Sequence, residues 1–271
     1  MALYDTIGNN YASFRRPDPR IAEAIDRALG DAVSVANIGA GAGSYEPVSK
    51  KVIAVEPSEV MIRQRSRSAA ACLLGSADAI PLEDGSVDAA MAILTIHHWP
   101  DLARGLRELA RVSRRRVVIL TWVPPRDGAI EMEAPGVRAD GLIPADPEPF
   151  WLTRDYFPEI LAHDRTIFPA SADLAALLEQ TIGRVRASVL AIPHDCVDGM
   201  LCAYWRRPEL YLVPERRAAM SSFARISAER GVAKLRADID DGAWTLRNRD
   251  LLDLDALDCG YRIVVCEKTL I

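Results

Sequence analysis

The sequence predicts an α/β protein built on a mostly parallel sheet of about seven strands. Over the first two thirds of the chain, short apolar runs of β type alternate with helical patterns, which is typical of strand-helix-strand units. The apolar runs are nearly continuous, which indicates strands that helices cover on both faces. A glycine-rich turn follows the first run at once, where sheets of this kind commonly bind nucleotide-like ligands.

The elements before residue 123 can be placed in order. The first helix is expected over residues 17–29, because Pro17 can open a helix and Gly30 can end one. The expected strands are 33–39, 51–56, 71–77, 87–94 and 114–123, and further helices are expected at 58–68 and 101–112.

After Trp122 the alternation of strand and helix patterns ends, because eight of the 17 prolines fall between residues 121 and 170. We expect this stretch to be irregular and to form a lid or binding loop. The later elements are then a helix at 171–180, a strand at 185–193, a helical insertion at 194–249 and a last strand at 260–268.

We expect one domain over residues 1–271, with two insertions that meet above one edge of the sheet. Its cofactor-binding core would comprise about 17–123, 171–193 and 260–270, and its substrate lid and cap about 124–170 and 194–250.

Composition excludes several classes of protein. The chain has 271 residues, of which 49% are hydrophobic and 26% are charged, which argues against disorder, fibres and disulfide scaffolds. A formal net charge of -5 provides no basic surface for a nucleic acid, so no such partner is expected. No apolar run is long enough for a membrane span and the N-terminus lacks a signal pattern, so a cytoplasmic location without membrane partners is expected.

A metal site is not expected. The five cysteines form no C-x-x-C pair, and only His194, Cys196 and Cys202 lie close together in the sequence. Buried, reduced thiols explain these cysteines better than zinc ligands or disulfides.

The glycine-rich turn carries the best chemical signal. Gly39, Gly41 and Gly43 form a G-x-G-x-G pattern at the end of the first expected strand, where a missing Cβ lets a ligand approach the main chain. Glu56 ends the second expected strand, 17 residues after Gly39, where a carboxylate can accept both hydroxyl hydrogens of a ribose. The alternatives are that the glycines form a turn without a ligand and that Glu56 is a solvated acid in a loop.

The spacing of the glycines argues against a dinucleotide. Dinucleotide enzymes favour G-x-G-x-x-G/A, in which the helix N-terminus faces the pyrophosphate. Here the sixth position is Ser44, so the turn need not cradle a pyrophosphate, and an NAD-dependent oxidoreductase is the less favoured reading.

The chain resembles the class I S-adenosylmethionine-dependent methyltransferases, in particular the small-molecule branch with type 11-like motifs. The matching stretches are VANIGAGAGSYEP, VIAVEPSEVM, GSADAIPLEDGSVDAAMAILTIHHW and RVSRRRVVILTW, which together cover roughly residues 32–122. The resemblance implies a Rossmann-like fold, S-adenosyl-L-methionine as cofactor and S-adenosyl-L-homocysteine as product.

The resemblance also assigns cofactor-binding residues. The turn would line the methionine part, Glu56 would bind the ribose, and Asp78 would accept a hydrogen bond from the adenine amino group. Tyr11 and Arg16 resemble cover residues that close over the cofactor. The full set is Tyr11, Arg16, Asn37, Gly39, Ala40, Gly41, Gly43, Glu56, Pro57, Ser58, Met61, Ala77, Asp78, Ala79, Leu94 and Thr95.

Asn37 departs from the family pattern, because many relatives carry Asp or Glu at this position. An amide can still accept a hydrogen bond through its carbonyl and can also donate one. It brings no negative charge to the ammonium group of the cofactor.

His97 is the candidate catalytic base, because an imidazole can take a proton near neutral pH. Neighbouring residues on an extended chain point to opposite sides, so we expect at most one of His97 and His98 to face the pocket. The alternative is that both histidines cap a turn and pack.

The family resemblance implies methyl transfer to a small-molecule acceptor, most simply to oxygen or nitrogen. Residues that could contact this acceptor are His98, Trp151, Tyr156 and Tyr204, because aromatic side chains provide flat walls with a polar tip. The alternatives are a non-methylating displacement and a regulatory protein that binds the same cofactor. The acceptor and the oligomeric state are left open.

Overall fold

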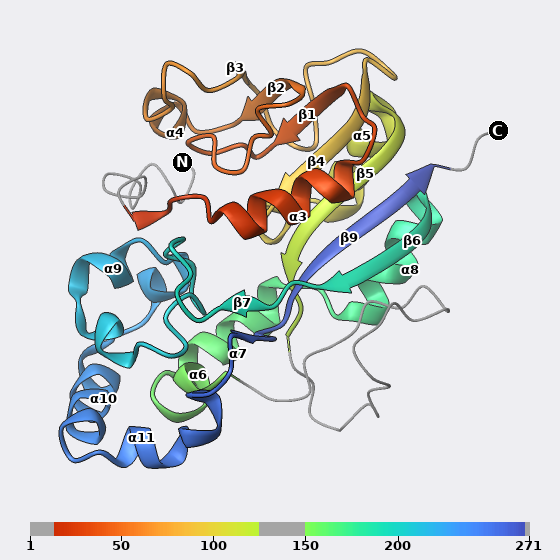
Figure 1. Ribbon diagram of the computed structural model, residues 1–271. Helices are drawn as coiled ribbons and strands as arrows, with labels where there is room; N and C mark the ends of the chain where they lie inside the picture. Colours follow the sequence, from red (N-terminus) through yellow and green to blue (C-terminus); the bar gives the residue numbers. More distant parts are fainter. Residues whose placement is uncertain (1–13, 125–149, 269–271) are drawn as a thin grey trace.

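Seven strands form one sheet in the computed structural model, which describes residues 14–124 and 150–268. The strand order is β3-β2-β1-β4-β5-β9-β6 (Figure 1). The strands are β1 (Ser34–Ile38), β2 (Lys51–Glu56), β3 (Ala71–Leu74), β4 (Val87–Ile93), β5 (Ser113–Trp122), β6 (Gly183–Val189) and β9 (Tyr261–Lys268).

Most neighbouring strands run parallel. The first five strands in the chain pair in parallel, and β9 lies antiparallel between β5 and β6, with Val118 opposite Val265 and Ala187 opposite Val264. The predicted seven-stranded, mostly parallel sheet is therefore confirmed. The carboxyl ends of β1, β2, β4 and β5 all meet at one edge, because parallel strands end on the same side.

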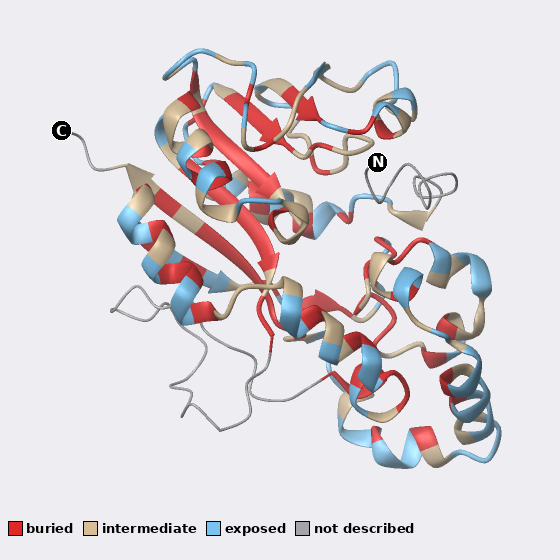
Figure 2. Ribbon diagram, turned by 180° about the vertical axis from the view of Figure 1, so that it is seen from behind, coloured by how far each residue is buried: buried red, intermediate tan, exposed pale blue. Residues whose placement is uncertain are grey.

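Helices cover both faces of the sheet, as predicted. Helix α3 (Pro19–Leu29) buries Ile21, Ile25 and Leu29 along one stripe and packs against β5 and β9. Helices α5 (Leu102–Val112) and α8 (Ser171–Thr181) cover the opposite face and contact each other (Figures 1 and 2). The sheet is thus the middle layer between two apolar cores.

Smaller elements gather beyond the carboxyl ends of the parallel strands and form a cap (Figure 1). The cap comprises α6 (Trp151–Asp155), α7 (Pro158–Ile167), η3 (Pro208–Leu212), α9 (Pro214–Ala218), η4 (Ser221–Arg225), α10 (Glu229–Asp240), α11 (Ala243–Arg247) and η5 (Arg249–Leu251). A separate two-stranded sheet, β7 (Ile192–Pro193) with β8 (Ala256–Leu257), joins the cap to the main sheet.

Two predicted elements before residue 80 are shorter than expected. Helix α4 spans only Glu59–Arg63, because the Ser66 hydroxyl accepts a hydrogen bond from the Ser68 amide and so favours a turn. Strand β3 ends at Leu74 and forms an exposed edge, with Leu74 59% exposed. The expectation that every strand is covered on both faces is therefore wrong for β3.

The expectation of an irregular segment over residues 121–170 is wrong in its second half. Residues 125–149 lie outside the described residues, but α6 and α7 follow them as regular helices. Pro158 occupies the start of α7, where a proline costs no backbone hydrogen bond and so begins a helix instead of breaking it.

The strand expected over residues 185–193 is divided in two. The amide of Leu190 still donates to the carbonyl of Tyr261, and beyond this point the chain leaves β9 to pair with β8. Among the helices of the described ranges, none has both the length and the apolarity needed to cross a membrane.

Candidate active site

A cavity of about 590 Å³ lies at the carboxyl edge of the sheet, between the strand ends and the cap. One part is lined by the predicted cofactor segments, and the other part by residues of η2 (Ile96–His98), α7 and η4. Of the predicted cofactor residues, those that line the cavity are Asn37, Gly39, Ala40, Gly41, Glu56, Pro57, Met61, Ala77, Leu94 and Thr95.

The turn after β1 requires glycine at its first position. Gly39 has φ +70°, and a Cβ on it would lie 2.2 Å from the Thr95 hydroxyl oxygen. Gly41 also has positive φ, at +53°. The turn therefore exposes its main chain to the cavity, whereas Gly43 lies outside the lining and approaches the Arg65 side chain.

Glu56 connects the two loops that follow β1 and β2. Its carboxylate is 5% exposed and accepts hydrogen bonds from the amides of Gly41 at 2.8 Å and Ser58 at 3.0 Å. Ser58 is itself buried and caps α4, since its hydroxyl accepts from the Met61 amide at 3.3 Å. Ser58 thus positions the loop and does not line the cavity.

Asn37 lies at the end of β1 and is 1% exposed. Its amide nitrogen donates to Glu46 at 3.2 Å, while its carbonyl oxygen is buried without a hydrogen-bond partner. Because buried polar atoms are almost always paired, this oxygen at the cavity wall is suited to accept a hydrogen bond from a ligand.

The ion pair that holds Asn37 was not predicted from the sequence. Glu46 forms an ion pair of 2.7 Å with Arg65, and the two side chains are 8% and 5% exposed. Arg65 also donates to the carbonyls of Gly41 and Ala70. The two residues are 19 positions apart, and no spacing rule connects a loop acid with an arginine beyond the next helix.

The segment after β3 contributes fewer residues to the cavity lining than predicted. Ala77 lines the cavity and is 8% exposed, but Asp78 and Ala79 do not line it, and Ala79 is exposed. A hydrogen bond from Ser76 lowers the pKa of the Asp78 carboxyl, and Ser76 lines the cavity in its place.

Both histidines of η2 line the cavity, so the expectation that only one of them faces it is wrong. They lie on a short helix instead of an extended chain, and their ring centroids are 3.9 Å apart. The His97 ring also stacks on Phe168 at 4.1 Å, and its Nδ1 atom is buried without a hydrogen-bond partner.

Burial controls the charge of these rings. It holds the pKa of His97 well below 6.5, helped by His98 and Arg15, and it lowers the pKa of His98 to about 4, helped by Arg225. Both imidazoles are therefore neutral at physiological pH.

We expect the His97 ring to remain neutral as the pH falls from 8 through 6.5, the ordinary pKa of an imidazole, because charging it would require burying a cation. Histidine side-chain NMR over this pH range checks this, with the His97 signal assigned by its loss in His97→Ala. A midpoint near 6.5 would contradict the expectation.

Arg15 takes the place expected for Arg16. Arg16 is exposed and does not line the cavity, whereas Arg15 lines it and pairs with Asp198 at 2.5 Å. Tyr11 lies outside the described residues.

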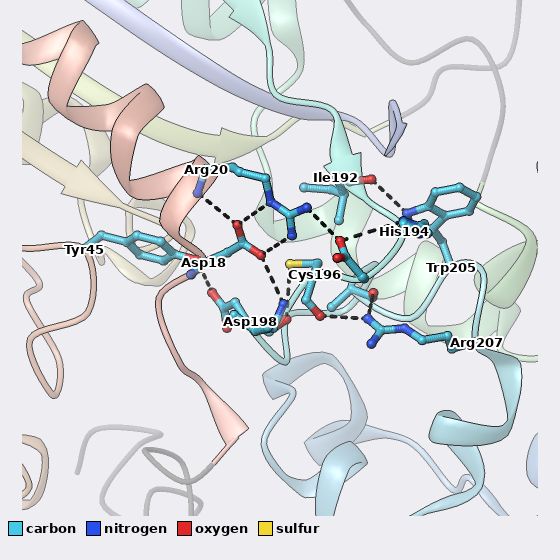
Figure 3. A network of polar contacts seen from close by, with 12 residues as sticks. Asp18, Arg20, Tyr45, Ile192, His194, Cys196, Asp198, Trp205 and Arg207 are labelled. Carbon is cyan, nitrogen blue, oxygen red and sulfur yellow. Dashed lines mark hydrogen bonds and ion pairs between the residues drawn. The ribbon is translucent and has the colours of Figure 1, made fainter. Parts of the chain in front are cut away.

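Asp198 is the centre of a network that joins the N-terminal segment, the glycine turn and the cap (Figure 3). Its carboxylate is 1% exposed and accepts from the Tyr45 hydroxyl at 2.7 Å. Nearby, Asp18 accepts hydrogen bonds from Arg20 at 2.9 Å and from the Val197 amide at 3.1 Å. These contacts fix the cap against the cofactor half of the cavity.

Replacing Tyr45 by phenylalanine is expected to lower the free energy of unfolding by about 1–2 kcal/mol, because Asp198 loses a buried hydrogen-bond donor. Urea denaturation of the two proteins measures this difference. An unchanged midpoint would show that the hydroxyl does not stabilise the junction.

Three predicted substrate residues lie in the core of the cap and not at the cavity. Trp151 and Tyr204 are 3% and 2% exposed, and the Trp151 indole donates to the Trp205 carbonyl at 2.9 Å. The Tyr156 hydroxyl donates to Asp238 at 2.8 Å. Their polar atoms are thus used inside the protein, which corrects the expectation that these side chains form walls for an acceptor.

Other side chains line the part of the cavity that would hold the acceptor. The apolar ones come from β5, α7, the loop before η3 and η4, and the polar ones come mostly from η2, α7 and η4. They are Trp122, Ile167, Phe168, Met200, Leu201 and Met220, with His97, His98, His163, Asp164, Ser221, Ser222 and Arg225.

Comparisons with known proteins agree with this geometry. A family described as "Methyltransferase domain" matches residues 36–121. A solved structure from Anabaena variabilis, described as a candidate methyltransferase from an antibiotic biosynthesis pathway, is 34% identical with a TM-score of 0.80, covering 96% of this chain and 100% of that one. The chain belongs to the class I S-adenosylmethionine-dependent methyltransferases.

Curated relatives match over a smaller part. A mouse protein, tRNA (carboxymethyluridine(34)-5-O)-methyltransferase ALKBH8, is 34% identical over 131 residues, which are 44% of this chain and 19% of that protein. An uncharacterized methyltransferase of Mycobacterium tuberculosis is 35% identical over 117 residues, which are 40% of this chain and 48% of that one. The chain thus spans less than half the length of these relatives.

The residues present fit the cofactor of this methyltransferase family. The glycine turn leaves room against the main chain, the unpartnered Asn37 oxygen can accept from an ammonium group, and the Glu56 carboxylate has acceptor capacity beyond two hydrogen bonds. Within residues 14–124 and 150–268, no group of three or more His, Cys, Asp or Glu side chains is arranged to hold a metal ion.

Proposed function

We propose that this methyltransferase acts on a small-molecule acceptor and transfers the methyl group to oxygen or nitrogen. The observation that carries this proposal is a continuous cavity that is lined both by the glycine turn and by residues of the cap. An acceptor in the cap half of the cavity would contact residues of α7 and η4.

The chain's main contribution is alignment. Bound S-adenosylmethionine supplies an activated methyl group, whose bond to sulfur breaks as the acceptor's lone pair forms the new bond to carbon. Holding two reactants in line and excluding water can lower a barrier by about 7–11 kcal/mol. Leu94 and Thr95 line the cavity, and Leu94 is fixed by its amide, which donates to the Leu120 carbonyl at 2.8 Å.

His97 is the candidate proton acceptor for a hydroxyl substrate, and its burial makes it a weaker base than a free imidazole. Its unpartnered Nδ1 and its neutral state allow it to accept a hydrogen bond from a hydroxyl. An amine that arrives neutral needs no base. If His97→Ala retains full activity at every pH, His97 has no role as a base, and the methyltransferase assignment is unaffected.

Calorimetric titration with S-adenosylmethionine, S-adenosylhomocysteine and NAD tests which cofactor the protein binds. We expect the first two to bind and NAD not to bind. Transfer of a tritiated methyl group then tests the class of acceptor. A small-molecule extract and total tRNA serve as separate substrates.

Each outcome of the transfer experiment decides between the alternatives. Label in small molecules supports the proposal. Label in tRNA would overturn it in favour of a substrate like that of the mouse relative, which the net charge of -5 disfavours. Binding without transfer to either pool would favour a regulatory or non-methylating role.

A further inference from the structure

We propose that Asp164 is the acceptor-recognition group of the cavity and that the acceptor is an apolar small molecule carrying a protonated amine. This inference rests on the small-molecule methyl transfer proposed above and names the class of its substrate.

Asp164 is a buried carboxylate for which the described residues provide no cationic partner. It lies on α7, is 3% exposed and lines the cavity. The only hydrogen bond to its carboxylate within the described ranges comes from the Ser222 hydroxyl, at 3.3 Å, and no lysine, arginine or histidine of those ranges forms an ion pair with it. Buried acids are normally paired, so among the residues that the structure describes Asp164 lacks the cation that would complete this site.

The surroundings favour a ligand as the source of that cation. Apolar side chains form a large part of the walls of the cap half of the cavity, among them Phe168, Met200 and Met220. A protonated amine on an apolar body would contact these side chains and bring its charge to Asp164. The same apolar surroundings would strengthen the attraction between the two charges.

The ionisation of Asp164 is consistent with this assignment. Burial raises the pKa of its carboxyl to about 7, and the Ser222 hydroxyl opposes this shift. The ionisable groups that line the same cavity are Arg15, Tyr45, Glu56, His97, His98, His163, Arg225 and Tyr261. Arg15 is paired with Asp198 and the η2 imidazoles are neutral, so none of these three supplies a free cation to Asp164.

Calorimetry on protein saturated with S-adenosylhomocysteine tests the inference. The probes are hexylamine, phenethylamine and tryptamine, each compared with the corresponding alcohol and carboxylic acid. We expect at least one amine to bind about tenfold more tightly than its alcohol at pH 8, and this preference to weaken as the pH falls below the pKa of Asp164.

Two variants make the result specific. Asp164→Asn should abolish the preference for the amine. Glu159→Gln, which changes an exposed acid on the same helix, should retain it. A preference that survives in Asp164→Asn, or no amine preferred over its alcohol, overturns the inference. The saturating titration separates this failure from a failure to bind the cofactor.

Thermal unfolding provides a readout that needs no ligand. Between about pH 4 and about pH 7 the Asp164 carboxyl is ionised in the unfolded chain but stays protonated in the native protein. Wild-type protein should therefore lose stability relative to Asp164→Asn as the pH rises through this range. A difference in Tm that is constant over this range would contradict the absence of a cationic partner.

Discussion

Replacing Glu56 by alanine is expected to weaken S-adenosylmethionine binding by about 100-fold or more. The carboxylate is 5% exposed at the cavity wall and also accepts from the Gly41 amide. Two lost hydrogen bonds from ribose hydroxyls to a charged acceptor account for about 3–6 kcal/mol. In addition, the Gly41 amide loses its acceptor, so the turn after β1 is less well held. Calorimetric titration of the variant with S-adenosylhomocysteine measures the effect.

Glu59→Ala is the matched control. Glu59 lies three residues later, is 67% exposed and pairs only with the equally exposed Arg63, so cofactor affinity should not change. A Glu56→Ala protein that binds within about tenfold of wild type would place the ribose away from Glu56 and would require another arrangement of the cofactor.

Replacing Arg65 by alanine is expected to destabilise the protein by about 3–5 kcal/mol, because it leaves the Glu46 carboxylate buried without its counterion. The loss should be accompanied by weaker cofactor binding, since Glu46 also holds the Asn37 amide. Urea denaturation followed by circular dichroism measures the first effect, and calorimetry measures the second.

Arg63→Ala tests whether burial is the cause. Arg63 also pairs with a glutamate, at 3.0 Å, but its side chain is 66% exposed, and an exposed pair of this kind contributes about 0.3–0.5 kcal/mol. If the Arg63 and Arg65 variants lose similar stability, the buried pair does not anchor the glycine turn.

Much of the cofactor half could be predicted because its signals are local in sequence. Gly39 and Gly41 are separated by one residue, and positive φ angles in a tight turn demand glycine wherever the turn occurs. Glu56 was identified for a similar reason, because the last residue of a parallel strand lies at the ligand edge of the sheet whatever its neighbours are.

The acceptor half could not be predicted because its contacts are remote in sequence. Asp164 meets Ser222 across 58 residues, and its burial follows from how α7 packs beneath η4. Trp151 and Tyr156 were expected at the cavity because of their chemistry, but chemistry alone does not distinguish an aromatic wall from an aromatic core. The packing of the cap buries them away from the cavity.

The sequence by itself determined the strand pattern, the glycine turn and the carboxylate at the end of β2, because each depends on residues within one or two elements. The tertiary structure decided which charges are paired: it joined Glu46 to Arg65 and gave Asp164 no cationic partner within residues 14–124 and 150–268. The physical reason is that a residue's type sets its charge, whereas packing sets its desolvation and its distance to a partner. Desolvation and distance then decide whether the charge stabilises the fold or is available to bind a ligand.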